Sequence, residues 1–235
     1  MKILLTGATG YIGSRLLPAL IVQGHEVTCC VRNAEKFKAR NNFDVDVLEI
    51  DFENETLPDD LPENIDTAFY LIHSMTGSIG KFAEIERKTA ESFIKLADQT
   101  GVKQIIYLSG LINADELSAH LESRKNVENV LRNAKAKLTV FRSGIIIGEG
   151  SSSFEIIRDL VEKLPVMVTP RWLNTKSQPI SIRNVVKYLT SAINHPECIG
   201  KTFDIGGSDV LPYEEMLLQY AEVRGLKRFI KVVPV

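Results

Sequence analysis

The sequence predicts a doubly wound α/β domain, in which helices cover both faces of a parallel sheet. Three observations support this class. Short apolar segments alternate with amphipathic helical patterns, a glycine-rich turn follows the first apolar segment, and most apolar segments are continuous runs. Continuous apolar strands are typical of a parallel sheet with two buried faces, and the strand–helix alternation is typical of βαβ units.

Six segments rich in Val, Ile, Leu or Phe are predicted to be the strands, in the spatial order 3-2-1-4-5-6. They are residues 2–6, 26–31, 45–50, 67–72, 104–109 and 138–143. Two intervening helices have the clearest patterns. One spans about 80–100, where Thr89 and several apolar residues share a face and Gly101 ends the pattern, and the other spans about 115–134.

The pattern changes from about residue 144. Residues 1–145 are predicted to form the doubly wound domain, and 146–235 a C-terminal segment that mixes returning strands with a small substrate-binding part. Within it, helices are expected near 153–164, 183–194 and 212–224, and strands at 179–182, 201–205 and 229–233. A proline-bracketed, less regular stretch contains Trp172, which with Phe154 could line a substrate pocket. The sequence ends within an apolar run, as expected of a chain truncated inside a strand.

Composition argues against several classes of protein. The 235 residues are 44% hydrophobic and 25% charged, with a net charge of −2, so no nucleic-acid partner is expected. No apolar run reaches the roughly 18 residues of a membrane span, and Lys2 followed by a strand is no signal peptide, so a cytoplasmic location is expected. Cys29, Cys30 and Cys198 fit neither a disulfide framework nor a metal site.

The strongest functional signal is Thr6-Gly-Ala-Thr-Gly-Tyr-Ile-Gly13, which joins the first strand to the first helix. Gly7 permits the tight turn, Gly10 lets a phosphate approach the backbone, and Gly13 lets the helix lie close to the sheet. The helix N-terminus offers N–H groups and a positive dipole end to a pyrophosphate. The predicted contacts of a bound dinucleotide are therefore Thr6, Gly7, Thr9, Gly10, Tyr11, Ile12 and Gly13.

The end of the second predicted strand bears on which dinucleotide binds. NAD-specific domains carry an acid there to bond the ribose 2′-hydroxyl, whereas this chain has Val31 followed by Arg32. A guanidinium can hold a 2′-phosphate bidentately, which favours NADP(H) over NAD(H). The alternative is that Arg32 is a solvated surface charge.

These motifs, together with Gly24-His-Glu-Val27, resemble the short-chain dehydrogenase/reductase superfamily. The likeness is to its extended and atypical branches, which include NAD-dependent sugar-nucleotide epimerases and NmrA-like proteins. It covers nearly the whole chain, through residues 101–110, 141–145, 178–186 and 202–207. The resemblance implies a Rossmann fold.

The resemblance also implies further cofactor contacts. Asp51 and Phe52 would flank the adenine, and Ile72, His73 and Ser74 would line its ribose. Their positions after strands agree with this, because ligands collect at the carboxyl ends of strands in open α/β sheets. By position alone, further candidates near the nicotinamide are Glu86, Tyr11, Arg142 and Ser143. Leu108 is a further predicted cofactor contact.

The expected catalytic pair is absent. Redox members of the superfamily use Tyr-x-x-x-Lys on the fifth helix, where the lysine lowers the pKa of the tyrosine. Here the matching stretch is His120-Leu-Glu-Ser-Arg124, so His120 and Arg124 occupy those two positions on one helix face. They are the candidate catalytic residues, together with Ser109 at a strand end. A neighbouring cation favours the neutral imidazole, which can act as a base but not as an acid. The alternative is that this helix face takes no part in chemistry.

Two classes of function remain open. In one, the protein binds the dinucleotide without turnover, as an NADPH redox sensor or assembly module with a protein partner, as NmrA-like relatives do. The replaced Tyr-x-x-x-Lys pair favours this class. In the other, the protein is an NADP-dependent oxidoreductase or epimerase-like isomerase that acts on a small molecule.

Overall fold

The computed structural model describes residues 1–54, 56–73, 79–112 and 118–233. The chain forms two compact units. The first contains Met1–Arg142 and Val186–Asp204, and the second contains Ser143–Val185 and Ile205–Val235. The C-terminal segment expected at 146–235 therefore contributes residues to both units.

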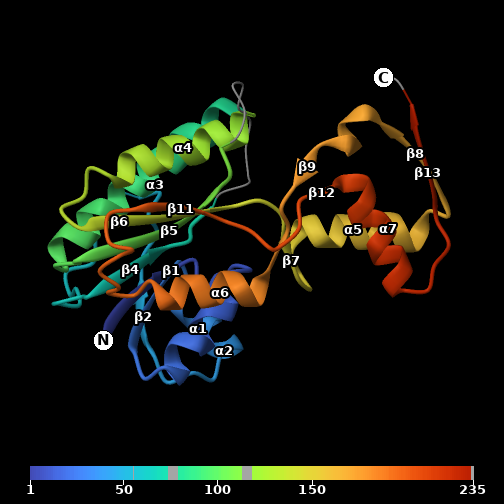
Figure 1. Ribbon diagram of the computed structural model, residues 1–235. Coiled ribbons are helices and arrows are strands. Elements are labelled where there is room, and N and C mark those ends of the chain that lie inside the picture. The colour runs from blue at the N-terminus through green and yellow to red at the C-terminus, as the bar shows by residue number, and fades with distance from the viewer. Residues whose placement is uncertain (55, 74–78, 113–117, 234–235) are drawn as a thin grey trace. The chain divides into compact units, whose positions relative to one another are not determined.

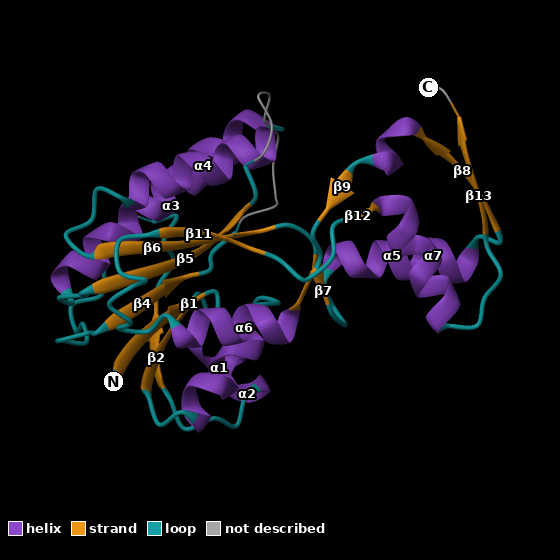
Figure 2. Cartoon of the chain, in the orientation of Figure 1, coloured by secondary structure: helices purple, strands orange, loops and turns teal. Residues whose placement is uncertain are grey.

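The first unit contains a seven-stranded sheet in the order β11-β6-β5-β4-β1-β2-β3 (Figures 1 and 2). Its strands are β1 (Lys2–Thr6), β2 (Glu26–Val31), β3 (Asp46–Glu49), β4 (Thr67–Tyr70), β5 (Gln104–Gly110), β6 (Lys137–Ser143) and β11 (Thr202–Ile205). The pairs β1–β2, β1–β4, β2–β3 and β4–β5 are parallel. The predicted doubly wound class and the order of its first six strands are confirmed.

Helices cover both faces of this sheet, with α3 and α4 on one side and α1 and α6 on the other (Figure 1). The helices are α1 (Gly13–Val22), α2 (Ala34–Arg40), α3 (Ile79–Gln99), α4 (Ala119–Leu131) and α6 (Ile182–Ser191). Helix α4 begins after Ser118, whose hydroxyl accepts a hydrogen bond from the Leu121 N–H. The sequence pattern gave no bounds for α2, because only Phe37 of its seven residues is buried and a single apolar residue shows no periodicity.

One core cluster of the first unit lies between the sheet and the helices α3 and α4. Every residue of β4 is buried, as are the first six residues of β5. Tyr70 of β4 packs edge-on against Phe93 of α3, with ring centroids 4.9 Å apart. This packing holds the carboxyl ends of the central strands in place, and it explains why these strands are continuous apolar runs.

The second unit contains helices α5 (Ser152–Lys163) and α7 (Tyr213–Val223), the 3-10 helix η1 (Arg171–Asn174) and three small two-stranded sheets. The strand pairs are β7 (Ile146–Ile147) with β10 (Ile180–Ser181), β9 (Lys176–Ser177) with β12 (Leu211–Pro212), and β8 (Val166–Pro170) with β13 (Phe229–Val233). A small core gathers around Ile157, Val161 and Leu217. Strand β8 falls in the stretch expected to be irregular, because its flanking prolines conceal a strand whose partner lies far along the chain.

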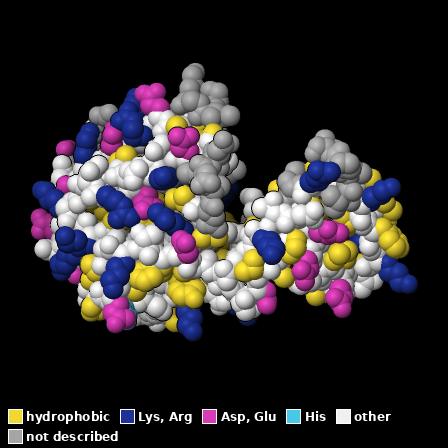
Figure 3. Space-filling view, turned by 45° about the horizontal axis from the view of Figure 1, so that its top comes forward, with side chains coloured by type: hydrophobic (Ala, Val, Ile, Leu, Met, Phe, Trp, Pro, Cys, Tyr) yellow, Lys and Arg dark blue, Asp and Glu magenta, His cyan; other side chains and the backbone are white. Residues whose placement is uncertain are grey.

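Large apolar side chains also remain on the surface of the second unit, as Figure 3 shows. Val166, Val168 and Phe229 of the β8–β13 sheet are each at least 60% exposed, and Ile156 of α5 is 61% exposed. In the described part of the chain, no helix is long and apolar enough to span a membrane.

Candidate functional site

The candidate site begins at the carboxyl end of β1, where the glycine-rich turn leads into α1. Gly7 has a φ of +66°, and a Cβ atom there would lie 2.5 Å from the Leu71 carbonyl oxygen, so the position requires glycine. A Cβ atom on Gly13 would overlap the Gly7 carbonyl group. The Gly10 N–H closes the turn by donating to the Gly7 carbonyl oxygen at 2.9 Å. The turn therefore packs so closely against β4 and against itself that Gly7 and Gly13 leave no room for a side chain.

A cavity of about 280 Å³ lies beside this turn, at the carboxyl ends of β1 to β4. Eight of the predicted cofactor contacts line it: Gly7, Thr9, Gly10, Arg32, Asp51, Phe52, Ile72 and His73. The remaining lining residues are Cys30, Val31, Ile50, Glu53, Leu71 and Thr89. Five segments separated in sequence thus meet around one space, at the edge where open α/β sheets bind ligands.

Thr89 of α3 is the least expected of the lining residues. It is 3% exposed, and its hydroxyl has no hydrogen-bond partner among the described residues. A buried hydroxyl without a partner is costly unless a ligand or water satisfies it. Its position on the buried face of a predicted amphipathic helix was the available signal, but a threonine there is indistinguishable from an ordinary core residue.

The other walls of the cavity differ in charge. Arg32 is exposed at the end of β2, and it is the single arginine or lysine among the described residues that line the cavity. Asp51 shapes the turn after β3, because its carboxylate accepts hydrogen bonds from the Glu53 N–H and the Asn54 side chain, each at 3.2 Å. Burial raises the pKa of the Cys30 thiol, so this side chain is a neutral wall.

A buried acid lies next to the cavity-lining His73. Glu86 of α3 is 3% exposed, its Oε1 lies 2.7 Å from His73 Nδ1, and its Oε2 accepts the Ser123 hydroxyl at 2.5 Å. Burial alone raises the pKa of Glu86, but the bonds from His73 and Ser123 and the nearby Arg124 guanidinium outweigh burial and hold the pKa below its usual value. Glu86 is therefore ionised. Because a carboxylate only accepts, His73 Nδ1 carries a proton.

Two of the predicted catalytic residues, Arg124 and Ser109, are not among the described residues that line the cavity. The Arg124 guanidinium donates to the Leu108 carbonyl oxygen and lies over the Tyr107 ring, 4.9 Å from its centroid. The Tyr107 hydroxyl donates in turn to the Arg124 carbonyl oxygen at 3.3 Å. Arg124 thus links α4 to β5, while Ser109 is buried in β5. The His120 side chain lies outside the described residues, so its role stays a prediction.

Other predicted residues have separate surroundings. Arg142 of β6 pairs bidentately with the buried Glu128 of α4, with an Nη2–Oε2 distance of 2.9 Å. Thr6 bridges β1 and β4, donating to the Phe69 carbonyl oxygen at 2.9 Å and accepting from the Leu71 N–H at 3.0 Å. Tyr11, Ile12 and Gly13 belong to the turn and the start of α1 but are not among the lining residues.

Three further predicted residues have surroundings that are only partly described. Phe154 of α5 packs edge-on against Tyr220 of α7, with ring centroids 5.6 Å apart. Ser74 and the side chain of Trp172 lie outside the described residues. A substrate pocket around Trp172 and Phe154 therefore stays a prediction.

Solved structures share this fold. One is a UDP-glucose 4-epimerase from Thermotoga maritima with UDP-glucose, with a TM-score of 0.77 and 16% identity over 100% of this chain and 86% of that chain. Another is a short-chain dehydrogenase/reductase superfamily protein from Agrobacterium tumefaciens with bound NAD, with a TM-score of 0.76 and 14% identity over 100% and 85% of the two chains. The architecture of this chain is therefore a Rossmann fold.

Sequence comparison gives the narrower assignment. The chain belongs to the NmrA-like family, whose model matches residues 1–224. It is 24% identical to the photosystem II assembly factor Ycf39 of Guillardia theta, over 100% of this chain and 74% of that protein. It is 22% identical to the UDP-glucose 4-epimerase of Vibrio cholerae, over 94% of this chain and 75% of that protein.

Proposed function

We propose that this protein binds NADP(H), with the adenosine and pyrophosphate groups in the cavity of the first unit. One observation carries the proposal: the glycine turn, Arg32 and Phe52 line a single cavity beside the N-terminus of α1. These residues match the chemistry of a pyrophosphate, a 2′-phosphate and an adenine ring. The close-packed glycine turn, in which Gly7 and Gly13 have no room for a Cβ atom, and the unpartnered Thr89 hydroxyl both fit a bound dinucleotide.

The preference for NADP(H) rests on charge at the end of β2. Val31 occupies the position at which NAD-specific domains carry an acid, so no carboxylate there would repel a 2′-phosphate. Arg32 follows directly and lines the cavity. Its planar guanidinium can bond two phosphate oxygens at once and can stack on the adenine.

An Arg32→Ala variant tests this preference. We expect NADPH binding to weaken by about 1.5–3 kcal/mol, the usual value of hydrogen bonds to charged groups, and NADH binding to stay nearly unchanged. Calorimetry on both cofactors measures the split. Arg40→Ala, at an exposed site in the last turn of α2, is the matched control and should alter neither affinity. Equal losses for NADPH and NADH, or a wild-type preference for NADH, would contradict the proposal.

We further propose that binding occurs without the Tyr–Lys chemistry of the superfamily, in the manner of an NADPH sensor or assembly module. Arg124, at the lysine position, is occupied by the Leu108 carbonyl group and the Tyr107 ring. Burial raises the pKa of Tyr107 to about 12, whereas a proton-shuttling tyrosine needs a lowered pKa. The likeness to Ycf39, a photosystem II assembly factor, supports a role that involves a protein partner.

A second candidate is an NADP-dependent oxidoreductase or epimerase-like isomerase, supported by the likeness to UDP-glucose 4-epimerase. The nicotinamide would supply hydride transfer, and His120 would move the proton at the substrate oxygen. His120→Phe should then lower turnover by roughly 10²–10⁴-fold, the usual value of a general acid or base, with cofactor affinity retained.

NADPH oxidation screened against carbonyls, quinones and UDP-sugars measures that turnover. Tight NADPH binding by the wild-type protein without turnover of any substrate would favour the sensor. Turnover that survives in His120→Phe would remove His120 from the mechanism.

A further inference from the structure

Thr89 of α3 carries a buried hydroxyl group for which the described residues provide no hydrogen-bond partner. The residue is 3% exposed, and it lines the cavity of the first unit. A buried hydroxyl group without a hydrogen bond carries a cost in free energy, which a ligand or a water molecule can offset. Thr89 is therefore placed to bond a ligand in this cavity.

The missing bond is unusual for a threonine in a helix, whose hydroxyl group commonly donates to a carbonyl group of the preceding turn. Thr100, directly after α3, donates in this way to the Leu96 carbonyl oxygen at 2.8 Å. Thr190 of α6 donates to the Lys187 carbonyl oxygen at 3.2 Å. Thr89 makes no such bond to the preceding turn of α3, which belongs to the described part of the chain. Its hydroxyl group therefore stays available to a ligand.

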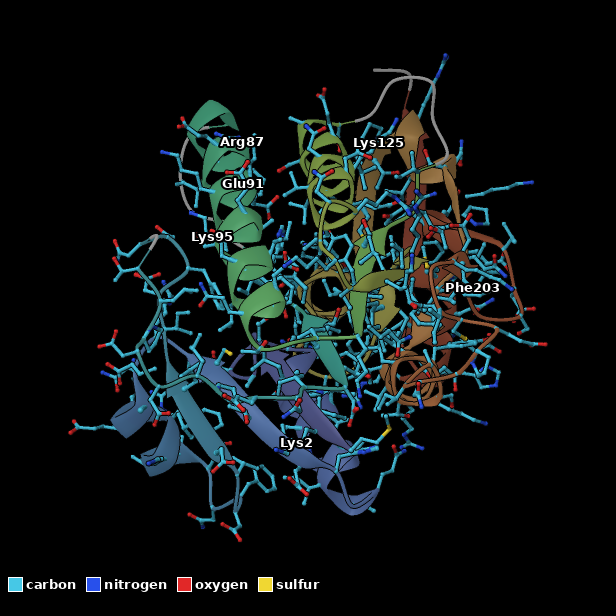
Figure 4. All side chains as sticks on the ribbon, turned by 90° about the vertical axis from the view of Figure 1, so that its left-hand side faces the viewer. Lys2, Arg87, Glu91, Lys95, Lys125 and Phe203 are labelled. Atoms are coloured by element: carbon cyan, nitrogen blue, oxygen red, sulfur yellow. The ribbon has the colours of Figure 1, made fainter. Side chains whose placement is uncertain are left out.

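The two faces of α3 show which part of the cavity Thr89 borders. Arg87 and Glu91, each two residues from Thr89, form an ion pair at 2.6 Å on the outer side of the helix, where both side chains are about half exposed (Figure 4). Phe93 follows Thr89 by one turn on the inner side. Its ring packs edge-on against Phe52, with centroids 6.1 Å apart. Thr89 thus lies on the helix face that packs toward the Phe52 wall of the cavity.

This wall of the cavity is apolar. Its side chains are Cys30, Ile50, Phe52 and Ile72, which belong to, or pack against, one core cluster. By contrast, the charged lining residues Arg32 and Glu53 are exposed. A flat ring with apolar faces and a polar edge matches this combination, because the wall can contact a face while the hydroxyl group bonds the edge.

We propose that the Thr89 hydroxyl group recognises the adenine base of the dinucleotide through a hydrogen bond to N1 or to the 6-amino group. This inference rests on the proposed binding of NADP(H), and it identifies a residue that recognises the base. Thr89 is thereby a specificity-determining residue of the same cavity.

The geometry of the nucleotide selects this edge of the base. The ribose is attached at N9, on the opposite side of the ring system from N1 and the 6-amino group. In the proposed orientation the phosphates lie at the glycine turn and at Arg32, so the edge far from the ribose reaches the buried hydroxyl group. Adenine presents an acceptor and a donor side by side on that edge. A hydroxyl group can donate to the first or accept from the second.

Thr89→Val tests the contact, because it exchanges the hydroxyl group for a methyl group. We expect the affinity of the full chain for NADP⁺, measured by calorimetry, to fall by about 2- to 12-fold, in keeping with one hydrogen bond between neutral groups. Thr89→Ser keeps the hydroxyl group and should retain most of the affinity.

Thr100→Val is the matched control, since it makes the same exchange at a buried threonine that is not among the residues lining the cavity. Its hydroxyl group is bonded within the protein. The variant should therefore lose thermal stability and keep its affinity for NADP⁺, the reverse of the result expected for Thr89→Val.

Analogues of NADP⁺ identify the part of the ligand that Thr89 bonds. Adenine is replaced by 1-deazaadenine, which lacks N1, or by purine, which lacks the 6-amino group. The control is 7-deazaadenine, which lacks N7 on another edge. The ratio of wild-type to Thr89→Val affinity should fall toward one for at least one of the first two analogues, and it should persist for the third.

The outcomes separate this inference from the proposed function. Unchanged NADP⁺ affinity in folded Thr89→Val would overturn the inference and leave the proposed function intact. An affinity loss of equal size with all three analogues would do the same, because the hydroxyl group would then bond another part of the ligand or a water molecule. No NADP⁺ binding by the wild-type protein would overturn both. Should Thr89→Val fail to fold, Thr89→Ala removes the same hydroxyl group and decides in its place.

Discussion

At the carboxyl edge of the sheet, arginines have different surroundings on the two sides. On the glycine-turn side, at the ends of β1, β2 and β3, Gly10, Arg32 and Phe52 line a cavity. On the α4 side, at the ends of β5 and β6, Arg124 bonds the Leu108 carbonyl group and Arg142 pairs with Glu128. Both sides therefore carry arginines at strand ends or on the next helix, but those of the α4 side hold the helix to the sheet.

This difference shows why position at a strand end is necessary for a ligand contact but not sufficient. An arginine is available to a phosphate only if no buried carboxylate or carbonyl group already engages it. Glu128 is 3% exposed, and it would lose its bidentate partner and keep Arg132 alone if Arg142 turned toward a ligand. The His73–Glu86–Ser123 cluster joins the two sides, because it runs from the cavity to α4.

The largest expected effect comes from Arg142→Ala, on the α4 side. Removing the bidentate partner of buried Glu128 should lower the free energy of unfolding by about 1.5–3 kcal/mol, although Arg132 remains within 2.5 Å of the same carboxylate. Denaturant unfolding measures the loss. NADPH affinity should not change, which is the reverse of the expectation for Arg32→Ala. A stable Arg142→Ala variant that loses cofactor affinity would erase the distinction between the two sides.

The next effect is on affinity, from Gly10→Val on the glycine-turn side. A Cβ atom at Gly10 would lie 3.2 Å from the Gly7 carbonyl oxygen, a tight contact that small shifts can relieve, so the fold should survive. The branched side chain would block the approach of the pyrophosphate. We expect NADPH affinity to fall at least about tenfold, or 1.4 kcal/mol, by calorimetry. Unchanged affinity in a folded variant would remove the phosphate site from this turn.

The smallest effect is expected from Thr89→Val, which exchanges a hydroxyl for a methyl group of similar size. The buried hydroxyl has no partner among the described residues, so the thermal stability of the ligand-free protein should stay the same or rise slightly. Affinity for NADPH should fall by about 0.5–1.5 kcal/mol if the ligand accepts or donates a hydrogen bond there. A loss of stability without a change in affinity would make Thr89 a core residue.

Local patterns account for most of what the sequence predicted correctly. The six strands and their order follow from apolar runs and right-handed βαβ connections, which depend on neighbouring residues. Strand β8 was not predicted, because it depends on pairing with β13 across a long stretch of chain. The bounds of α2 could not be predicted, because this helix buries only Phe37. The prolines around β8 predicted an irregular segment, because the distant pairing partner of this strand leaves no local signal.

For the candidate site, the sequence by itself determined the glycines, whose role depends on backbone conformation and close packing. Gly7 and Gly13 are recognisable because no other residue fits their contacts, and the spacing of the turn is local. Only the tertiary structure decided the allocation of charged and polar side chains. The burial of Glu86, its bonds to His73 and Ser123, and the engagement of Arg142 by Glu128 depend on which elements pack together. Partners that lie on different helices and strands leave no periodic pattern, so the sequence placed these residues near the site without separating ligand contacts from those that hold the fold.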